Sequence, residues 1–428
     1  MRLRACLLAI AVVVPVRAFA QTPPPAAPPP PPPPVEAAPP PVAPPPPAAA
    51  PAPMAPPMAV VVPPPAAAPS AVPLPKFTWG GLIDTYYMFN FIRADGANTL
   101  TPPSGRAFDT NANSMTLALA KMSLNASMDI VSFQLDFGYG TTGTVINANN
   151  TGNPVAASVA SAIGTTNLPP DFLLEQAYGE ISLPGNLTLD FGKFVTTAGA
   201  EVIEANKNWL YSRSFLFNAI PLLHTGVRAN LKVNDQLTLQ ASLVNGWNDD
   251  PDDNAWKTGG VSATITVNPM VSIVATTYFG KESSNLTMTG PTPGDLRFLG
   301  DLVVALALND KLGLNLNFDY IDAPPETMVP ADSSSNHLLG VSLMGRYIVN
   351  DHLYLSARGE FVQNHAGGGN LNQEEFTVMA GIPVGKNFEL RPEIRGDFAN
   401  NNAFAFDATG APTKKDQFTG TLAALTFF

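Results

Sequence analysis

Charged residues, cysteine and long apolar runs are all scarce in this chain of 428 residues. Only 13% of the residues are charged, against about 25% in typical soluble domains, so a water-facing surface would be difficult to cover. No apolar run after residue 20 is long enough for a membrane-spanning helix, which argues against a helical membrane protein. The one cysteine, Cys6, lies in the N-terminal leader, so the mature chain has no thiol for a disulfide, a thiolate zinc site or a nucleophile.

Basic residues are also few. The chain has 23 Lys and Arg against 34 Asp and Glu, a net charge of −11, and loss of Arg2, Arg4 and Arg17 with the leader leaves 20 against 34, or −14. Binding of phosphates requires a basic face, so no nucleic-acid partner is expected.

The first 75 residues carry no fold signal. Residues 1–20 have a basic start, an apolar stretch over 5–14 and Ala18-Phe19-Ala20 before Gln21, which predicts a signal peptide cleaved after Ala20. Residues 22–75 hold 27 prolines, mostly among alanine and valine, so 21–75 is predicted to be a disordered, semi-rigid periplasmic linker. A second interpretation is a tether that reaches the cell wall or another envelope protein.

From Lys76 onward the pattern changes to short runs with a period of two. In the first run, Phe77, Trp79, Ile83 and Tyr87 share one parity, while polar residues such as Asp84 share the other. Similar alternation predicts sixteen strands, at about 77–91, 114–126, 130–140, 172–183, 187–195, 223–232, 236–246, 258–267, 270–280, 295–308, 311–321, 337–348, 351–363, 373–382, 387–398 and 416–428.

The connections between these strands alternate between tight turns and long polar segments. Turn-forming residues such as Pro184-Gly185-Asn186 make the tight connections. The eight long segments lie at about 92–113, 141–171, 196–222, 247–257, 281–294, 322–336, 364–372 and 399–415. This alternation is typical of an outer-membrane barrel, with short periplasmic turns and long outer loops. The predicted fold is therefore an all-β, transmembrane antiparallel barrel of about 16 strands over 76–428, closed because an open edge in hydrocarbon is costly.

Several stretches resemble one known family, the OmpL-like beta-barrel porins. The resemblance runs from Phe77 to Phe428, and the terminal phenylalanine also resembles the recognition signal of outer-membrane barrels. The matching stretches are Gly80–Tyr87, Gly192-Lys-Phe, Gly199-Ala-Glu201, Asn208-Trp209, Ser212-Arg-Ser214, Pro221, His224–Arg228, Asn245-Gly-Trp247 with the acidic Asp249 to Asn254 loop, Arg391-Pro-Glu393 and Lys414–Gln417. The proline-rich segment is not part of the pattern. The resemblance implies a porin in the bacterial outer membrane.

Charged residues on the polar parity are predicted to line the lumen. The strand 387–398 alternates five charges, and a row of this kind requires water or paired partners because a charge facing lipid is costly. The predicted lining residues of the wall are Arg228, Lys232, Arg346, Arg358, Glu360, Glu389, Arg391, Glu393 and Arg395. Sixteen strands normally leave an aqueous channel for passive diffusion of small hydrophilic solutes or ions; a closed, salt-bridged interior is the other interpretation.

The third long segment, 196–222, is assigned the constriction by its similarity in position to the inward-folded loop of 16-stranded general porins. Its charges are Glu201, Glu204, Lys207 and Arg213. Charges at a constriction set ion preference, so replacing Glu201 and Glu204 with glutamine should shift it. The alternative is that these charges only solvate an external loop.

The sequence shows few other candidate metal or catalytic sites, and no cofactor is expected. Asp249, Asp250, Asp252 and Asp253 are a weak calcium candidate without EF-hand spacing, and a solvated outer loop explains them equally. The four histidines show no paired metal spacing, and no nucleophile motif appears, so an enzyme is not expected, although a serine–histidine pair could assemble in space. Two further roles stay open: a tethering barrel that works through its proline arm, and a homo-trimer, for which Ala263, Ala357 and Ala380 are too scattered to identify an interface.

Overall fold

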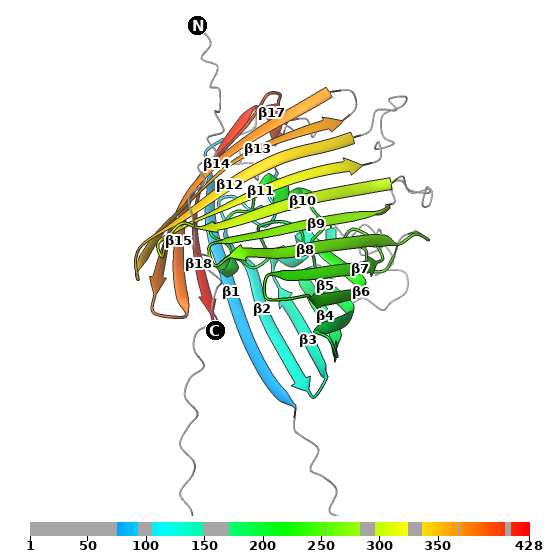
Figure 1. Ribbon diagram of the computed structural model, residues 1–428. Helices are drawn as coiled ribbons and strands as arrows, with labels where there is room; N and C mark the ends of the chain where they lie inside the picture. The colour runs from blue at the N-terminus through cyan, green and yellow to red at the C-terminus, as the bar shows by residue number, and fades with distance from the viewer. Residues whose placement is uncertain are drawn as a thin grey trace, which may run out of the picture. The chain divides into compact units, whose positions relative to one another are not determined.

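The computed structural model describes residues 75–92, 105–148, 171–252, 254–282, 296–323, 336–366, 369–406 and 412–428, and its main feature is one closed ring of antiparallel strands (Figure 1). The sixteen strands of the ring are β1 (Lys76–Asn90), β2 (Met115–Met128), β3 (Val131–Tyr139), β4 (Phe172–Leu183), β5 (Leu187–Val195), β6 (Leu223–Lys232), β7 (Leu237–Val244), β8 (Thr258–Asn268), β9 (Val271–Lys281), β10 (Leu296–Ala307), β11 (Leu312–Ala323), β12 (Asn336–Asn350), β13 (Leu353–Ala366), β14 (Gly369–Val384), β15 (Phe388–Ala399) and β18 (Asp416–Phe427). All sixteen predicted strands are confirmed, most of them to within two residues at each end.

The predicted parity decides which side chains face outward. On β1, Phe77, Trp79 and Ile83 are 72%, 67% and 51% exposed, whereas Asp84 and Asn90 are buried. Large apolar residues on the outer face and polar residues on the inner face are the arrangement that lipid outside and a polar lumen inside require. Within the described residues, no helix is both long and apolar enough to cross a membrane.

The ring closes where the last strand meets the first. β18 pairs with β1 from Leu82↔Phe427 to Asn90↔Thr419, and Phe428 exchanges two backbone hydrogen bonds of 3.2 Å with Gly81. A Cβ at Gly81 would lie 2.6 Å from the Phe428 ring, so glycine at this position lets the ring lie close to the backbone of β1. The terminal phenylalanine is thus part of the seam, edge to face against Trp79.

Three connections differ from the sequence prediction. The segment 364–372 is not a long loop, because β13 and β14 continue pairing to Ala366↔Gly369 although the sequence there no longer alternates apolar and polar residues. The segment 399–415 contains a small hairpin, β16 (Phe404–Phe406) with β17 (Pro412–Lys414). The segment 141–171 begins with a helix, α1 (Thr141–Ala148), which follows β3. Residues 149–170 lie outside the described residues, as do residues 21–74 of the proline-rich linker.

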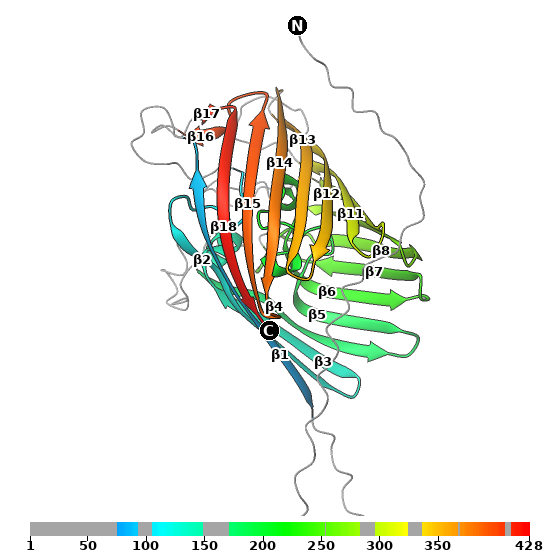
Figure 2. The same cartoon turned by 90° about the vertical axis from the view of Figure 1, so that its left-hand side faces the viewer.

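The interior of the ring is filled more than a simple channel would be. The segment 196–222 contains the 3₁₀ turn η1 (Ala205–Lys207) and the helix α3 (Phe215–Ala219), and its green ribbon lies inside the ring (Figure 2). Apolar side chains of this segment, such as Leu210 and Leu216, are fully buried against inward side chains of the strands. The sequence parity predicted an inner face that is polar throughout. The structure shows that this face also carries buried apolar side chains.

Candidate functional site

The segment 196–222, called the lumen loop below, is held against the barrel wall by contacts with residues far away in sequence. Its helix α3 is capped by Ser214, whose hydroxyl accepts a hydrogen bond of 3.0 Å from the Phe217 amide. Leu216 lies over Gly340 of β12, where any Cβ would overlap its side chain. The loop is thus positioned by its own local structure and by the shape of the wall beneath it.

Carboxylates of the wall accept hydrogen bonds from pairs of adjacent loop amides. Glu360 on β13 accepts from Phe215 N and Leu216 N at 2.7 and 2.8 Å. Glu393 on β15 accepts from Tyr211 N and Ser212 N at 2.7 and 3.1 Å. Charged acceptors make stronger hydrogen bonds than neutral ones, and all these groups are buried, so both pairs stabilise the docked loop.

Arginines of the wall satisfy the loop carbonyls in the same region. Arg358 donates to Ser212 O at 2.8 Å and pairs with Glu201 at 2.7 Å. Arg391 donates to Ala205 O and Asn208 O at 2.6 and 3.1 Å. The next arginine on β15, Arg395, donates to Arg213 O. These three wall arginines are at most 2% exposed, so the loop covers the charged row that the sequence placed along the lumen.

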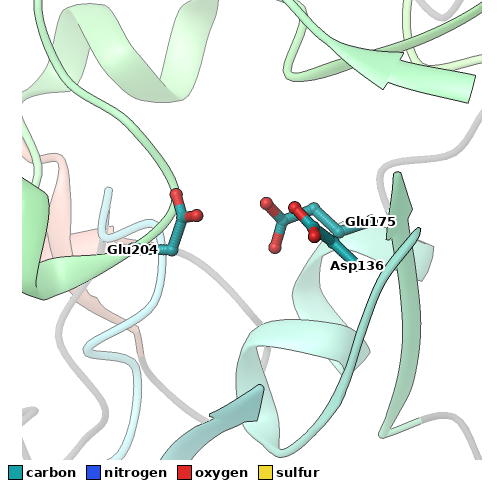
Figure 3. Close-up of side chains that lie close together, drawn as sticks. All are labelled: Asp136, Glu175 and Glu204. Carbon is teal, nitrogen blue, oxygen red and sulfur yellow. The ribbon is translucent and has the colours of Figure 1, made fainter. Parts of the chain in front are cut away.

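At its other side the loop is bound by a lysine at the centre of three carboxylates. Nζ of Lys121 on β2 lies 2.6 Å from Glu204, 2.7 Å from Glu175 on β4 and 3.2 Å from Asp136 on β3. The three carboxylates converge within 4.8 Å of one another, with Glu204 on one side and Glu175 and Asp136 together on the other (Figure 3). Because the ammonium group contacts all three, this cluster is an ion-paired anchor rather than a metal centre.

The ionisation of Glu204 follows from these partners. Burial raises the pKa of Glu204, but Lys121 and then Lys207 lower it by more, so its pKa falls from 4.5 to about 2. The nearby Tyr211 is also buried in the loop, where its hydroxyl donates to Asp84 at 3.0 Å, and burial raises the pKa of Tyr211 well above 10. Glu204 is therefore anionic and Tyr211 neutral at physiological pH.

The opposite part of the inner face stays open to solvent. We define the open wall as the inward residues of β3–β9 near their short turns, which are half-buried or exposed. They are Ser132, Gln134, Glu180, Thr188, Asn230, Lys232, Thr238, Gln240, Thr264, Thr266 and Ser272. All but Glu180 and Lys232 are neutral hydroxyl or amide side chains, and they are linked in part, as by Gln240 Nε2 to Asn230 Oδ1 at 2.8 Å.

We define the covered wall as ten of the buried polar residues at inward parity on β12–β15. They are Ser342, Ser356, Arg358, Glu360, Glu375, Thr377, Glu389, Arg391, Glu393 and Arg395. Glu375 pairs with Arg358 at 2.6 Å, and Glu389 pairs with Arg391 at 3.0 Å. Nine wall residues were predicted from the sequence to line the lumen. Six of them therefore lie in the covered wall, on which the lumen loop docks or next to which it lies.

The remaining predicted residues are placed in different surroundings. Arg228 pairs with Asp190 at 2.8 Å and lies over the Phe194 ring, and Lys232 pairs with Asp235 at a short turn. Arg346 lies 4.1 Å from the centroid of Tyr354. In the loop, Lys207 is the exposed cation, and Arg213 is buried and donates to loop carbonyls.

The calcium candidate residues are engaged elsewhere or not described. Asp250 pairs with Lys193 at 2.9 Å, Asp252 pairs with Lys257, and Asp249 is buried. Asp253 lies outside the described residues. Sequence reasoning missed Lys121 and Glu175, which anchor the loop. Lys121 sits among apolar residues at inward parity, and that isolated charge was the one available signal.

A family model described as "Putative beta-barrel porin-2, OmpL-like" matches residues 76–428. Among solved structures, OmpT of Vibrio cholerae has a TM-score of 0.54 at 12% identity, over 83% of this chain and 98% of that chain. DcaP of Acinetobacter baumannii has 0.52 at 11%, over 83% and 97%, and an anion-selective porin from Comamonas acidovorans has 0.51 at 8%, over 83% and 100%. At these identities the likeness concerns the fold alone. Among curated proteins, none matches the chain.

Proposed function

The chain belongs to the OmpL-like beta-barrel porin family, and we propose that it is a narrow diffusion channel whose solutes pass along the open wall. Family membership and fold agree on a barrel in the bacterial outer membrane that allows passive diffusion of small hydrophilic solutes. The observation that carries the finer proposal is the difference in burial between the two walls. The covered wall is closed by the lumen loop, whereas the open wall keeps hydrogen-bonding side chains accessible.

The chemistry of the open wall favours small polar solutes over a strongly selected ion. Its hydroxyl and amide groups can replace water around a solute without attracting one charge, and Glu180 and Lys232 oppose each other in sign. Glu201 and Glu204 are proposed to act at the constriction mainly by holding the loop, because both are ion-paired there. Ion preference set by local field is then weak.

Planar bilayer recording of the refolded protein tests this function. Discrete conductance steps with a reversal potential close to zero in a salt gradient are the expected result. Silent membranes at high protein concentration would contradict the channel, and they would favour the rival in which residues 22–75 act as a tether. Residues 22–74 lie outside the described part of the chain, so the tether rests on composition alone. No reaction is proposed for the barrel.

A homo-oligomer is proposed on one outer face of the barrel. A hollow of about 830 Å³ lies over β12–β15, β18 and β1, with Ala357, Ala380, Pro392 and Gly420 among its lining residues. The pairing of β14 with β15 is interrupted between Met379↔Glu393 and Ile382↔Leu390, so Ala380 and Gly381 have no partner there. Pro392 lies on β15 in this gap and has no N–H to donate.

A second copy of this chain is the occupant that this hollow fits. Small residues such as Ala357, Ala380 and Gly420 allow close approach of another barrel. A solved structure with the same fold, OmpT of Vibrio cholerae, is described in a trimer form. Light scattering of the detergent-solubilised protein should give a multiple of the chain mass, and Ala380→Trp should reduce it to one chain. A wild-type monomer would contradict the proposal.

A further inference from the structure

Two histidines meet on the outer surface at the loop-side end of β12 and β13. The register of these strands places His337 directly opposite His365. Their ring centroids lie 4.8 Å apart and the ring planes differ by 19°, so the imidazoles are stacked. Both residues share the parity of exposed outer residues such as Val341 and Phe361, and they therefore face away from the lumen and from the lumen loop.

The hydrogen bonding of His365 leaves one ring nitrogen available as a ligand. Nδ1 of His365 lies 2.7 Å from Oδ1 of Asn370, its direct neighbour on β14. Because Oδ1 only accepts, Nδ1 carries the proton and Nε2 carries the lone pair. Metal-binding histidines have this arrangement, in which the second nitrogen donates to an oxygen that fixes the tautomer and the ring orientation. Among the described residues, no hydrogen bond occupies the ring nitrogens of His337.

A carboxylate completes the row on the other side of His337. Asp322 of β11 is the direct cross-strand neighbour of His337. Directly opposite residues have Cβ atoms about 4.5–5.5 Å apart, so a change of side-chain rotamer would bring the Asp322 carboxylate to an ion held by the two histidines. In the structure the ligand atoms of these three residues do not converge within 4.8 Å of one another. The row across four strands is thus Asp322, His337, His365 and Asn370.

We propose that Asp322, His337 and His365 form a surface site for a divalent transition-metal ion of the copper or zinc class, with Asn370 as a positioning residue. Imidazole nitrogens suit copper and zinc, whereas calcium and magnesium prefer oxygen ligands throughout. Three protein ligands leave a position for water or for a group from outside the barrel. The site is separate from the channel, since its side chains lie on the outer face.

Copper(II) and zinc(II) binding to the full chain, refolded in detergent without a histidine tag, tests the proposal. We expect one equivalent of copper(II) with nitrogen hyperfine structure from two imidazoles in electron paramagnetic resonance. Titration calorimetry with zinc(II) should give one site per chain. His337→Gln or His365→Gln should each weaken zinc binding by at least about tenfold, and Asn370→Ala should weaken it by about 10- to 100-fold, the usual effect of losing such a partner.

His352→Gln is the matched control, because His352 is exposed in the tight turn at the other end of the same hairpin. It should leave metal binding and the two-nitrogen signal unchanged. Three results would overturn the proposal: no binding by the wild-type chain, equal binding by the His337→Gln/His365→Gln double variant, or equal loss in His352→Gln. Asp322→Asn should weaken zinc binding while both nitrogens remain in the copper spectrum, which separates the carboxylate from the imidazoles.

Discussion

The covered wall and the open wall are built from the same kind of alternating strand, yet they serve different purposes. On β13 and β15, inward charges such as Arg358 and Glu393 are nearly inaccessible because they hydrogen-bond the lumen loop. On β7 and β8, inward residues such as Gln240 and Thr264 stay partly exposed, although Thr197 of the lumen loop donates a hydrogen bond of 3.1 Å to Gln240 Oε1. The difference shows that charge in the lumen of a barrel can serve to hold a loop, and in the proposed function the neutral groups form the path for solutes.

The largest expected effect comes from removing the carboxylates that hold the loop. In the Glu360→Ala/Glu393→Ala variant four buried loop amides lose their acceptors, at about 1–3 kcal/mol for each unmade hydrogen bond. The loop should leave the covered wall, and single-channel conductance should rise several-fold. Glu374→Ala is the control, because Glu374 is exposed on the outer parity of β14. Wild-type conductance in the double variant would show that the covered wall does not close the lumen.

A smaller effect is expected from removing Lys121, which anchors the other side of the lumen loop. Lys121→Met removes the cation from Asp136, Glu175 and Glu204, and breaking a buried ion pair in this way costs about 3–5 kcal/mol. The expected result is a noisy channel with frequent transitions to a larger conductance, as one side of the loop detaches. Lys311→Met, at an exposed tight turn, should leave the recording unchanged. A quiet channel of normal size in Lys121→Met would contradict the anchoring role.

Adding a charge to the open wall should shift the reversal potential more than removing a charge from the covered wall. Gln240→Glu places a carboxylate on the accessible path, and it should shift the reversal potential toward cation preference by several millivolts. Glu389→Gln removes a buried charge from the covered wall and should shift the potential less. A larger shift in Glu389→Gln would mean that the solute path follows the covered wall.

The smallest effect concerns pH. The pKa of Glu204 falls from 4.5 to about 2 in the folded protein, so its stabilisation of the docked loop is fully present above about pH 4.5 and is lost as the pH falls through 2. Conductance should therefore be the same at pH 7 and pH 5, and it should become unstable only well below pH 4. Glu204→Gln should remove this acid transition. Opening between pH 5 and pH 6 would contradict the assignment to Glu204.

Much of the fold could be predicted because alternation and turn residues are local signals. The strand 387–398 was placed correctly, and its five charges are buried at inward parity, where charges require water or paired partners. Whether these charges contact water or protein groups could not be predicted from the sequence. Glu393 accepts a hydrogen bond from Tyr211 N only because the closed ring brings β15 and the lumen loop together. The histidine pair was missed for the same reason, because only the register of β12 and β13 places His337 beside His365.

Cysteine accessibility tests the two walls most directly, because the only native cysteine, Cys6, lies in the predicted leader. Four inward serines allow matched Ser→Cys changes: Ser132 and Ser272 on the open wall, and Ser342 and Ser356 on the covered wall, which are 1% and 3% exposed. A charged methanethiosulfonate reagent added to single channels should react at 132 and 272 and change the current there. It should leave 342 and 356 unmodified. Fast reaction at 342 and 356, with none at 132 and 272, would contradict a channel that runs along the open wall.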